Sequence, residues 1–241
     1  QRWKLRHHRQ ELEAAARVAP GDLELVCAVC ALAAEESVWL GRTLLEPHVH
    51  DPPATHAGVL SVVLYAHSLH MVPPELDPMP WFARAAALAE DLEDQHPAVE
   101  VALHTLAWTV ERGPQTSEEA WKALEARCGA DQGQNSKFNY LRSRLHANAG
   151  RTGESESSLH KARAWGKRCG DAGLEARALF ALVRAAIFRR DFDSAQRFLP
   201  EYFDAVDRCE NPYPRRHINW PCSTVASWRC CVGTLAPRLP G

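Results

Sequence analysis

Apolar side chains recur at helical spacing along most of the chain, and this periodicity constrains the fold more than any other feature. They occupy positions i, i+3, i+4 and i+7, and therefore lie on one face of each helix. The predicted helices span residues 3–17, 22–46, 55–71, 79–93, 97–111, 117–128, 135–149, 153–168, 173–189 and 192–208. We find no convincing period-two stretch of strand length, so we predict an all-α fold.

Clusters of Pro, Gly, Asp and Asn separate these segments and are typical of turns. Asp22 and Ser117 stand where N-caps belong. Residues 22–46 fit either two short helices, broken near residues 35–37, or one long helix. Helices joined by short turns lie antiparallel. Because one such pair cannot bury its apolar face alone, we predict that about five pairs stack into an array.

The second half of the chain repeats at an offset of 40 residues, as seen when residues 141–162 are aligned with residues 181–202. The alignment matches a turn position, a small position and an apolar position: Gly150 with Arg190, Ser155 with Ala195, and Leu159 with Leu199. A small residue lets two helices approach closely, and the following Leu is expected to fill the core between them. Ala120 takes the small position in an earlier, looser copy.

This pattern resembles the tetratricopeptide repeat. Gly150 takes the turn position of that family, Ser155 and Ala162 take its two Ala positions, and residues 191–195 stand where the family has Gly-Asp-Tyr-x-x-Ala. The resemblance covers about residues 55–208 and is specific in the last two units. Arg190 at the turn and Tyr202 at the second Ala position depart from the family, which leaves open a splayed last pair.

The resemblance implies a right-handed α–α superhelix over residues 1–208, clearest over residues 135–208. The long unit is similar to the degenerate repeats of bacterial regulators, such as MalT-like transcription activators and sensor regions of cyclases. It implies a protein- or peptide-binding scaffold in signal transduction or transcription regulation, which passes occupancy to an effector domain. GxSxG, GxxxxGK[ST] and GxGxxG motifs are absent from the sequence, so we predict no catalytic residue, no cofactor and no enzyme.

In tetratricopeptide proteins the first helix of each pair lines the concave surface. Counting back from the two turns places one basic, one aromatic and one further basic residue of each unit on that surface, with an amide after them: Lys137, Tyr140, Arg144 and Asn148, then Arg177, Phe180 and Arg184. Guanidinium groups bind carboxylates through two hydrogen bonds, so we expect an acidic partner. The alternative is that the basic side chains are solvated and the two aromatic rings lie in the core between helices.

Histidines and cysteines raise a second hypothesis, an all-α metal-dependent hydrolase that uses His48, His50, His67 and His70. Pro52 and Pro53 interrupt the metallohydrolase-like pattern that begins at His48, and the helix with His67 and His70 lacks the Glu of HExxH. Cys27 and Cys30 form a CxxC inside an apolar helical segment, where core packing is the simpler interpretation. We therefore predict no metal site.

The 28 basic and 30 acidic residues give a net charge of −2, which excludes a generally basic nucleic-acid-binding protein. No apolar run is long enough to cross a membrane, and the charged first ten residues do not resemble a signal peptide, so we expect a cytoplasmic location. Residues 209–241 form an irregular tail, whose last 31 residues hold four Arg and no acid. We expect nucleic-acid binding only through a further domain, or through Arg215, Arg216 and Arg229 of the tail.

Overall fold

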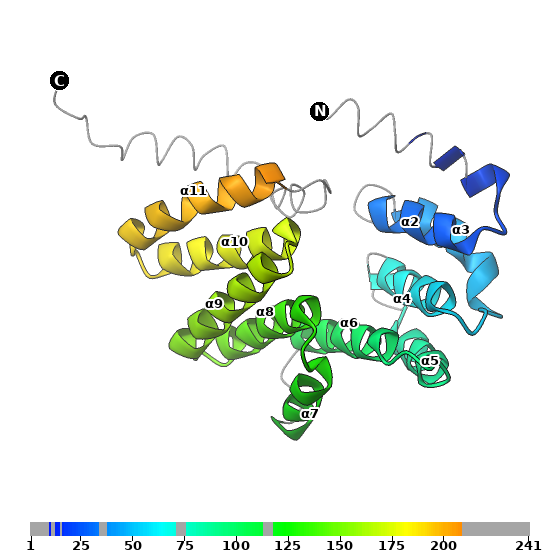
Figure 1. Cartoon of the computed structure of the whole chain (residues 1–241), viewed down its shortest axis with the longest axis horizontal. Coiled ribbons are helices and arrows are strands. Elements are labelled where there is room, and N and C mark those ends of the chain that lie inside the picture. The colour runs from blue at the N-terminus through cyan, green and yellow to red at the C-terminus, as the bar shows by residue number, and fades with distance from the viewer. Residues whose placement is uncertain are drawn as a thin grey trace.

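The computed structural model describes residues 10, 13–14, 16–33, 38–70, 76–112 and 118–208. All regular structure in these ranges is helical, which confirms the predicted all-α class (Figure 1). The basic tail, including Arg215, Arg216 and Arg229, lies outside the described residues, as do the N-cap prediction at Ser117 and most of the predicted helix 3–17. None of the described helices is long and apolar enough for a bilayer crossing.

The helices follow the predicted segments closely. Their bounds are α2 Leu23–Ala33, α3 Val38–Val49, α4 His56–His70, α5 Met79–Glu90, α6 His96–Arg112, α7 Glu118–Cys128, α8 Gln132–Asn148, α9 Thr152–Arg168, α10 Ala172–Phe188 and α11 Phe192–Arg208. Residues 22–46 hold parts of two helices, not one. Helix α8 begins three residues before its predicted start, because the Asp131 carboxylate accepts the Gln134 N–H (2.8 Å) and caps the helix.

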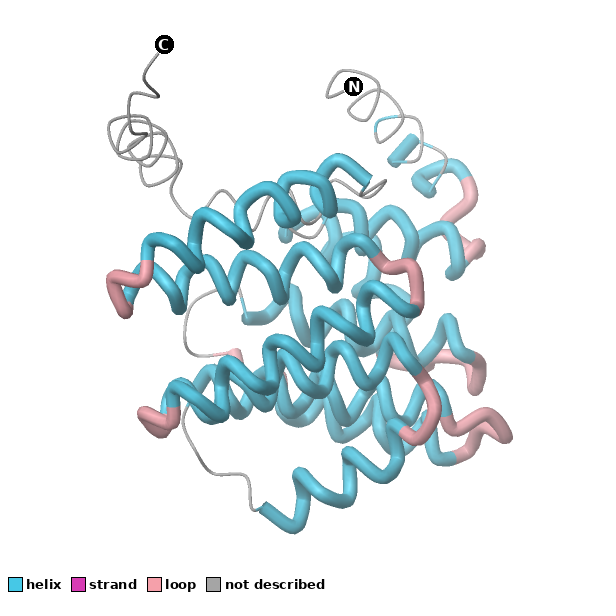
Figure 2. The backbone as a smooth tube through the Cα atoms, turned by 60° about the vertical axis from the view of Figure 1, so that its left-hand side comes forward, coloured by secondary structure: helices cyan, strands magenta, loops and turns pink. Residues whose placement is uncertain are grey.

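Consecutive helices pack side by side as pairs, α2 with α3 through to α10 with α11 (Figure 2). The first helix of each pair also packs against the first helix of the next, so that α2, α4, α6, α8 and α10 form a continuous layer. The pairs follow one another along a curved path, with α7 on its outer side (Figure 1). The main contacts between the described helices therefore join near neighbours in the sequence, as expected of a stacked array.

Equivalent positions are buried in four successive first helices. The fourth residue of each is buried, namely Val59, Val99, Asn135 and Glu175. The eighth residue is buried as well, namely Val63, Leu103, Asn139 and Leu179. Helices α4 and α6 begin 40 residues apart, as do α8 and α10. The recurrence of burial extends the repeat from the last two units to the region from α4 onward.

The small positions found in the sequence are buried in the last two pairs and not in the earlier copy. Ser155 on α9 and Ala195 on α11 are both buried, and so is Ala162. Leu159 is buried but Leu199 is only half-buried. The prediction for Ala120 is wrong: its side chain is exposed, and Trp121 is buried instead, against Phe138. Helix α7 therefore turns its large side chain toward the core at this point.

Left-handed residues end the long helices of the last two pairs. Gly150 and Gly170 both have φ 73°, and Arg190 has φ 61°. At the first of these turns, the Gly150 N–H donates to the Ala147 carbonyl (3.0 Å) and the Arg151 N–H donates to the His146 carbonyl (2.8 Å). The same two bonds recur around Arg190, whose backbone therefore takes the glycine conformation. The last pair is not splayed, since Tyr202 is buried against the helix α10 core.

Arg190→Gly is expected to stabilise the chain by about 0.5–1 kcal/mol. A non-glycine residue in the left-handed region costs about 1–2 kcal/mol, and part of the relief is offset by the greater freedom of glycine in the unfolded chain. Chemical denaturation measures the change. Gly170→Ala is the converse control and should destabilise by about 1 kcal/mol, since its new Cβ would meet no atom within 4 Å and only the backbone conformation opposes it. A destabilised Arg190→Gly variant would contradict the assignment of this turn.

Ala195→Leu tests the close contact between α10 and α11. Ala195 is only 2% exposed, so a larger side chain must displace its neighbours. We expect a loss of roughly 1–3 kcal/mol in the free energy of unfolding. Gln196→Leu, at an exposed position one residue later, is the matched control. Equal stability of the two variants would show that the repeat alignment is wrong.

Candidate functional site

A cavity of about 320 Å³ lies against the layer of first helices. Its lining comes from α4, α6, α8 and α10 and from the N-caps of α8 and α10: His56, Val59, Leu60, Val63, His96, Pro97, Glu100, Val101, His104, Asp131, Gly133, Gln134, Lys137, Asp171 and Leu174. Most of these residues lie in the N-terminal halves of their helices. A single surface therefore receives side chains from four successive repeats.

Helical periodicity explains why these side chains share one surface. His96, Glu100 and His104 are spaced i, i+4 and i+8 on α6, so they lie on one face of that helix. Gln134 and Lys137 are spaced i and i+3 on α8. Helices α6 and α8 thus present polar side chains to the cavity.

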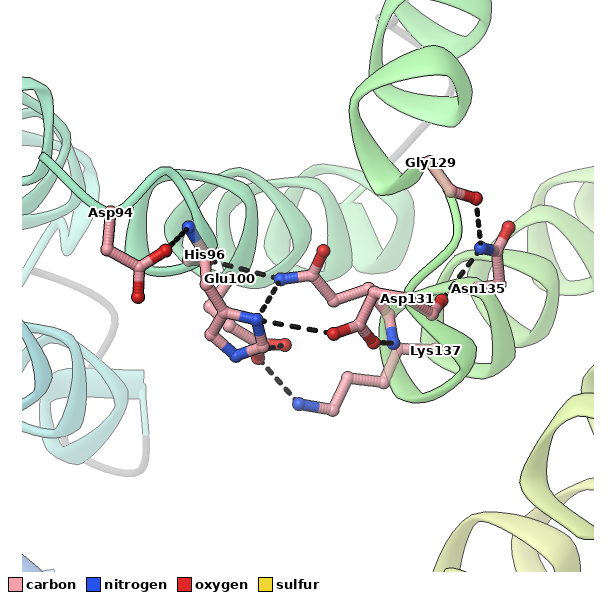
Figure 3. Close-up of polar contacts among 8 residues, drawn as sticks. Asp94, His96, Glu100, Gly129, Asp131, Asn135 and Lys137 are labelled. Atoms are coloured by element: carbon pink, nitrogen blue, oxygen red, sulfur yellow. Dashed lines mark hydrogen bonds and ion pairs between the residues drawn. The ribbon is translucent and has the colours of Figure 1, made fainter. Parts of the chain in front are cut away.

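Ion pairs and hydrogen bonds connect α6 to α8 at the wall of the cavity (Figure 3). Lys137 Nζ lies 2.5 Å from Glu100 Oε2. His96 Nδ1 lies 3.4 Å from Asp131 Oδ2 and 3.0 Å from Gln134 Nε2. Gln134 Nε2 also donates to the His96 carbonyl (3.1 Å). The Glu100 side chain is 19% exposed, so its negative charge is largely enclosed and is neutralised by the lysine.

The opposite side of the cavity is apolar. Val59 and Val63 of α4 and Val101 of α6 are all buried, and Leu60 is half-buried beside them. His56, the first residue of α4, faces His96, the first residue of α6, with ring centroids 6.3 Å apart. The cavity therefore combines an apolar side on α4 with a charged wall on α6 and α8.

A pair of imidazoles joins α4 to α6 next to this wall. His67 Nε2 and His104 Nδ1 lie 2.7 Å apart, and the ring of His67 also meets the edge of the Phe82 ring (centroids 5.4 Å). Partial burial between the helices, which leaves the His104 side chain 35% exposed, lowers its pKa below the usual 6.5. Positive charge on His67, Lys137 and Arg177 lowers the pKa further.

Lys137 is the predicted groove residue that lines the cavity. Arg177, its equivalent on α10, lies near enough to act on the same His104 imidazole. The two equivalent positions therefore lie near the same imidazole. However, Lys137 already pairs with Glu100, which the sequence analysis did not include.

The other predicted groove residues follow along α8 and α10, beyond the cavity lining. Tyr140 and Phe180 are half-buried against the cores of their own repeats. This position of the rings agrees with the alternative that placed them between helices. Arg184 lies over the rings of Phe180 and Phe188, at 5.9 and 5.8 Å from their centroids, and Arg144 is half-buried. Asn148 Nδ2 donates to the Val110 carbonyl (3.0 Å), so this amide also links α8 to α6.

The residues of the metal hypothesis do not gather in the described part of the chain, where no three His, Cys, Asp or Glu side chains are arranged to hold a metal ion. His67 pairs with His104, and His50 lies against Trp81. The side chain of His70 lies outside the described residues. Cys27 and Cys30 are buried in the first core cluster, as expected, and burial raises the pKa of each thiol to about 12.

Sequence reasoning missed His96, Glu100, His104, Asp131 and Gln134. The i, i+4, i+8 spacing on α6 was a usable signal, since it sets three titratable side chains on one face. Helix α6 lies outside the last two units, in which the sequence repeat is clearest. The chain matches no family model, and no curated protein matches its sequence.

Glu100→Gln tests the wall of the cavity. The change leaves Lys137 without its counter-charge at 2.5 Å, and we expect the free energy of unfolding to fall by about 1 kcal/mol at low salt. Added salt should reduce this loss because it screens the remaining charges. The matched control is Glu125→Gln, which removes one of the two carboxylates near Arg142 at a more exposed site, leaves Glu118 in place, and should change stability by less than about 0.5 kcal/mol. Equal losses in the two variants would show that enclosure of Glu100 is unimportant.

Proposed function

We propose that this chain is a non-catalytic scaffold that binds a protein or peptide partner along the layer of its first helices. The observation that carries the proposal is that one surface receives side chains of four successive first helices, α4, α6, α8 and α10. An extended partner segment that lies across these helices would contact every repeat in turn. Stacked helix pairs commonly use their curved surfaces in this way.

The chemistry of this surface supports an acidic partner with apolar side chains. Arg144 lies on α8 beyond the cavity lining. On α10, Arg177 near the cavity and Arg184 further along the helix are seven residues apart and share one helix face. Guanidinium groups bind carboxylates with two parallel hydrogen bonds. The apolar side of the cavity, formed by Val59, Leu60 and Val63, would receive a side chain of the partner.

The pairing of Lys137 with Glu100 adds a condition to this proposal. A carboxylate of the partner that reaches Lys137 must compete with Glu100 for it. We place the acidic contact at Arg144 and Arg184, in the second halves of α8 and α10, where a partner carboxylate would join contacts that these arginines already make. The cavity near their first halves would contribute shape and apolar contact.

We further propose that the array belongs to the tetratricopeptide-like group, with a right-handed superhelical path, and serves a bacterial cytoplasmic regulator. The 40-residue unit, the small residues Ser155 and Ala195, and the left-handed turns support the repeat assignment. In such a regulator, partner binding would be passed to an effector region. The regulatory role rests on this resemblance, because a fold does not dictate its function.

A selection from random displayed peptides tests the binding proposal. Peptides enriched by the chain should be rich in Asp and Glu beside apolar residues. The double variant Arg144→Glu with Arg184→Glu should bind them at least about tenfold more weakly, because it replaces attraction by repulsion. Fluorescence anisotropy with one labelled, enriched peptide measures the affinity.

The control carries the same charge change on the second helices, Lys122→Glu with Lys161→Glu, at exposed positions of α7 and α9. This variant should keep its affinity within about twofold. Circular dichroism checks that all variants remain helical. If no peptide is enriched, or if the double arginine variant binds as tightly as the control, the proposed site is wrong.

A further inference from the structure

We propose that one face of α11 binds the same face of a second copy of this chain, with the two α11 helices antiparallel. The residues of this face, which we call the end stripe, are Phe192, Gln196, Leu199 and Phe203. Helix α11 lies at one end of the curved path of described helices (Figure 1). The inference concerns self-association, and it does not depend on the binding of a peptide along the first helices.

The spacing of the end stripe places its residues on one side of α11. They follow one another at four, three and four residues, which is the spacing of a continuous helical face. Phe192 is 49% exposed and Phe203 is 45% exposed. Glu201, which pairs with Arg163 of α9, stands two residues before Phe203 and therefore about 200° around the helix from it. The end stripe thus points away from α9 and the preceding pair.

The previous pair shows what covers this face elsewhere in the array. On α9, Arg163 pairs with Glu201 of the next pair, and Leu159, one turn earlier on the same side, is buried. Forty residues later, Leu199 and Phe203 occupy these two positions on α11, and Leu199 is only half-buried. Within the described part of the chain no helix follows α11. The end stripe is therefore a stacking face of the repeat, with apolar residues at the positions that a next pair would cover.

The order of residues in the end stripe makes it complementary to itself. Intervals of four, three and four residues read the same in both directions, and an aromatic ring stands at each end. When two α11 helices pack antiparallel about a two-fold axis, Phe192 of one copy lies beside Phe203 of the other, and Gln196 lies beside Leu199. Each contact then occurs twice, as in any symmetric two-fold interface. Paired aromatic rings would bury much of the apolar surface that the single chain exposes.

The charges at the two ends of the end stripe fit the same antiparallel arrangement. Arg190 stands two residues before Phe192, and Asp207 stands four residues after Phe203; both are exposed. In the antiparallel pair the basic start of each stripe lies beside the acidic end of the other. A parallel pair would instead bring Asp207 against Asp207. Complementary charges fix the orientation of an interface, so they favour a second copy as the occupant of this face.

Sedimentation velocity of the full chain, with a reductant present to exclude disulfides, tests the proposal. Between about 1 and 300 µM the mass should rise from that of one chain toward that of two, as expected for a small interface. Phe203→Asp should weaken the dimer at least about tenfold, because it places a charge in the centre of the apolar contact. The control is Val18→Asp, the same kind of change at a residue that is 85% exposed near the other end of the array. It should leave the dimer within about twofold of the wild-type affinity.

An exchange of charges keeps the test decisive if Phe203→Asp fails to fold. Arg190→Glu and Asp207→Lys should each weaken the dimer about threefold to tenfold, since each change replaces two attractions by repulsions. Both changes in one chain should restore the dimer, because the exchanged charges again oppose each other. Circular dichroism checks that every variant remains helical.

Three results would overturn the proposal. The first is the mass of one chain at every concentration, which is also expected if residues 209–241 or a different protein cover the end stripe. The second is a mass that grows beyond two chains, since a symmetric two-fold contact closes at two. The third is a charge exchange that fails to restore the dimer. None of these results bears on peptide binding, which uses the first helices.

Discussion

Packing of each first helix on the first helix of the next pair is the interaction on which the rest of the structure depends. A single pair of helices has too little core to bury its apolar faces, so burial comes from its neighbours. The fourth and eighth positions of α4, α6, α8 and α10 are all buried in the stacked array. The same contact brings the first turns of these helices together and so creates the cavity.

The stacking of the first helices determines which charged side chains meet at the cavity. Side chains that would be solvated on an isolated helix meet across the layer, as Lys137 meets Glu100 and His67 meets His104. A charge that is partly withdrawn from water needs a partner, since an unpaired one costs more than a pair. The groove is therefore organised before any ligand arrives. Any partner of this surface has to fit charges that are already partly neutralised.

Two residues depart from the repeat pattern without disrupting the last helix pair, because backbone hydrogen bonds and side-chain packing both stabilise it. Arg190 replaces a turn glycine, yet the two hydrogen bonds that end α10 still form and the last pair stays closed. Tyr202 replaces a small residue and is buried, with its ring 5.8 Å from that of Phe180. Because of such substitutions, the residue types at single positions do not show the repeat. The pattern of buried positions still recurs from unit to unit.

Helical periodicity alone determined the fold class, the order of the helices and most of their ends, because the 3.6-residue period depends only on neighbours along the chain. The start of α8 was missed because Asp131 sat within a cluster of turn residues, where its role as a cap depended on one hydrogen bond. Only the tertiary structure decided which side chains meet. Lys137 contacts Glu100, and His104 contacts His67, each across 37 residues of sequence. The offset and inclination of neighbouring helices decide these pairings. Periodicity shows which residues share a face of one helix, but not which residues of another helix that face will meet.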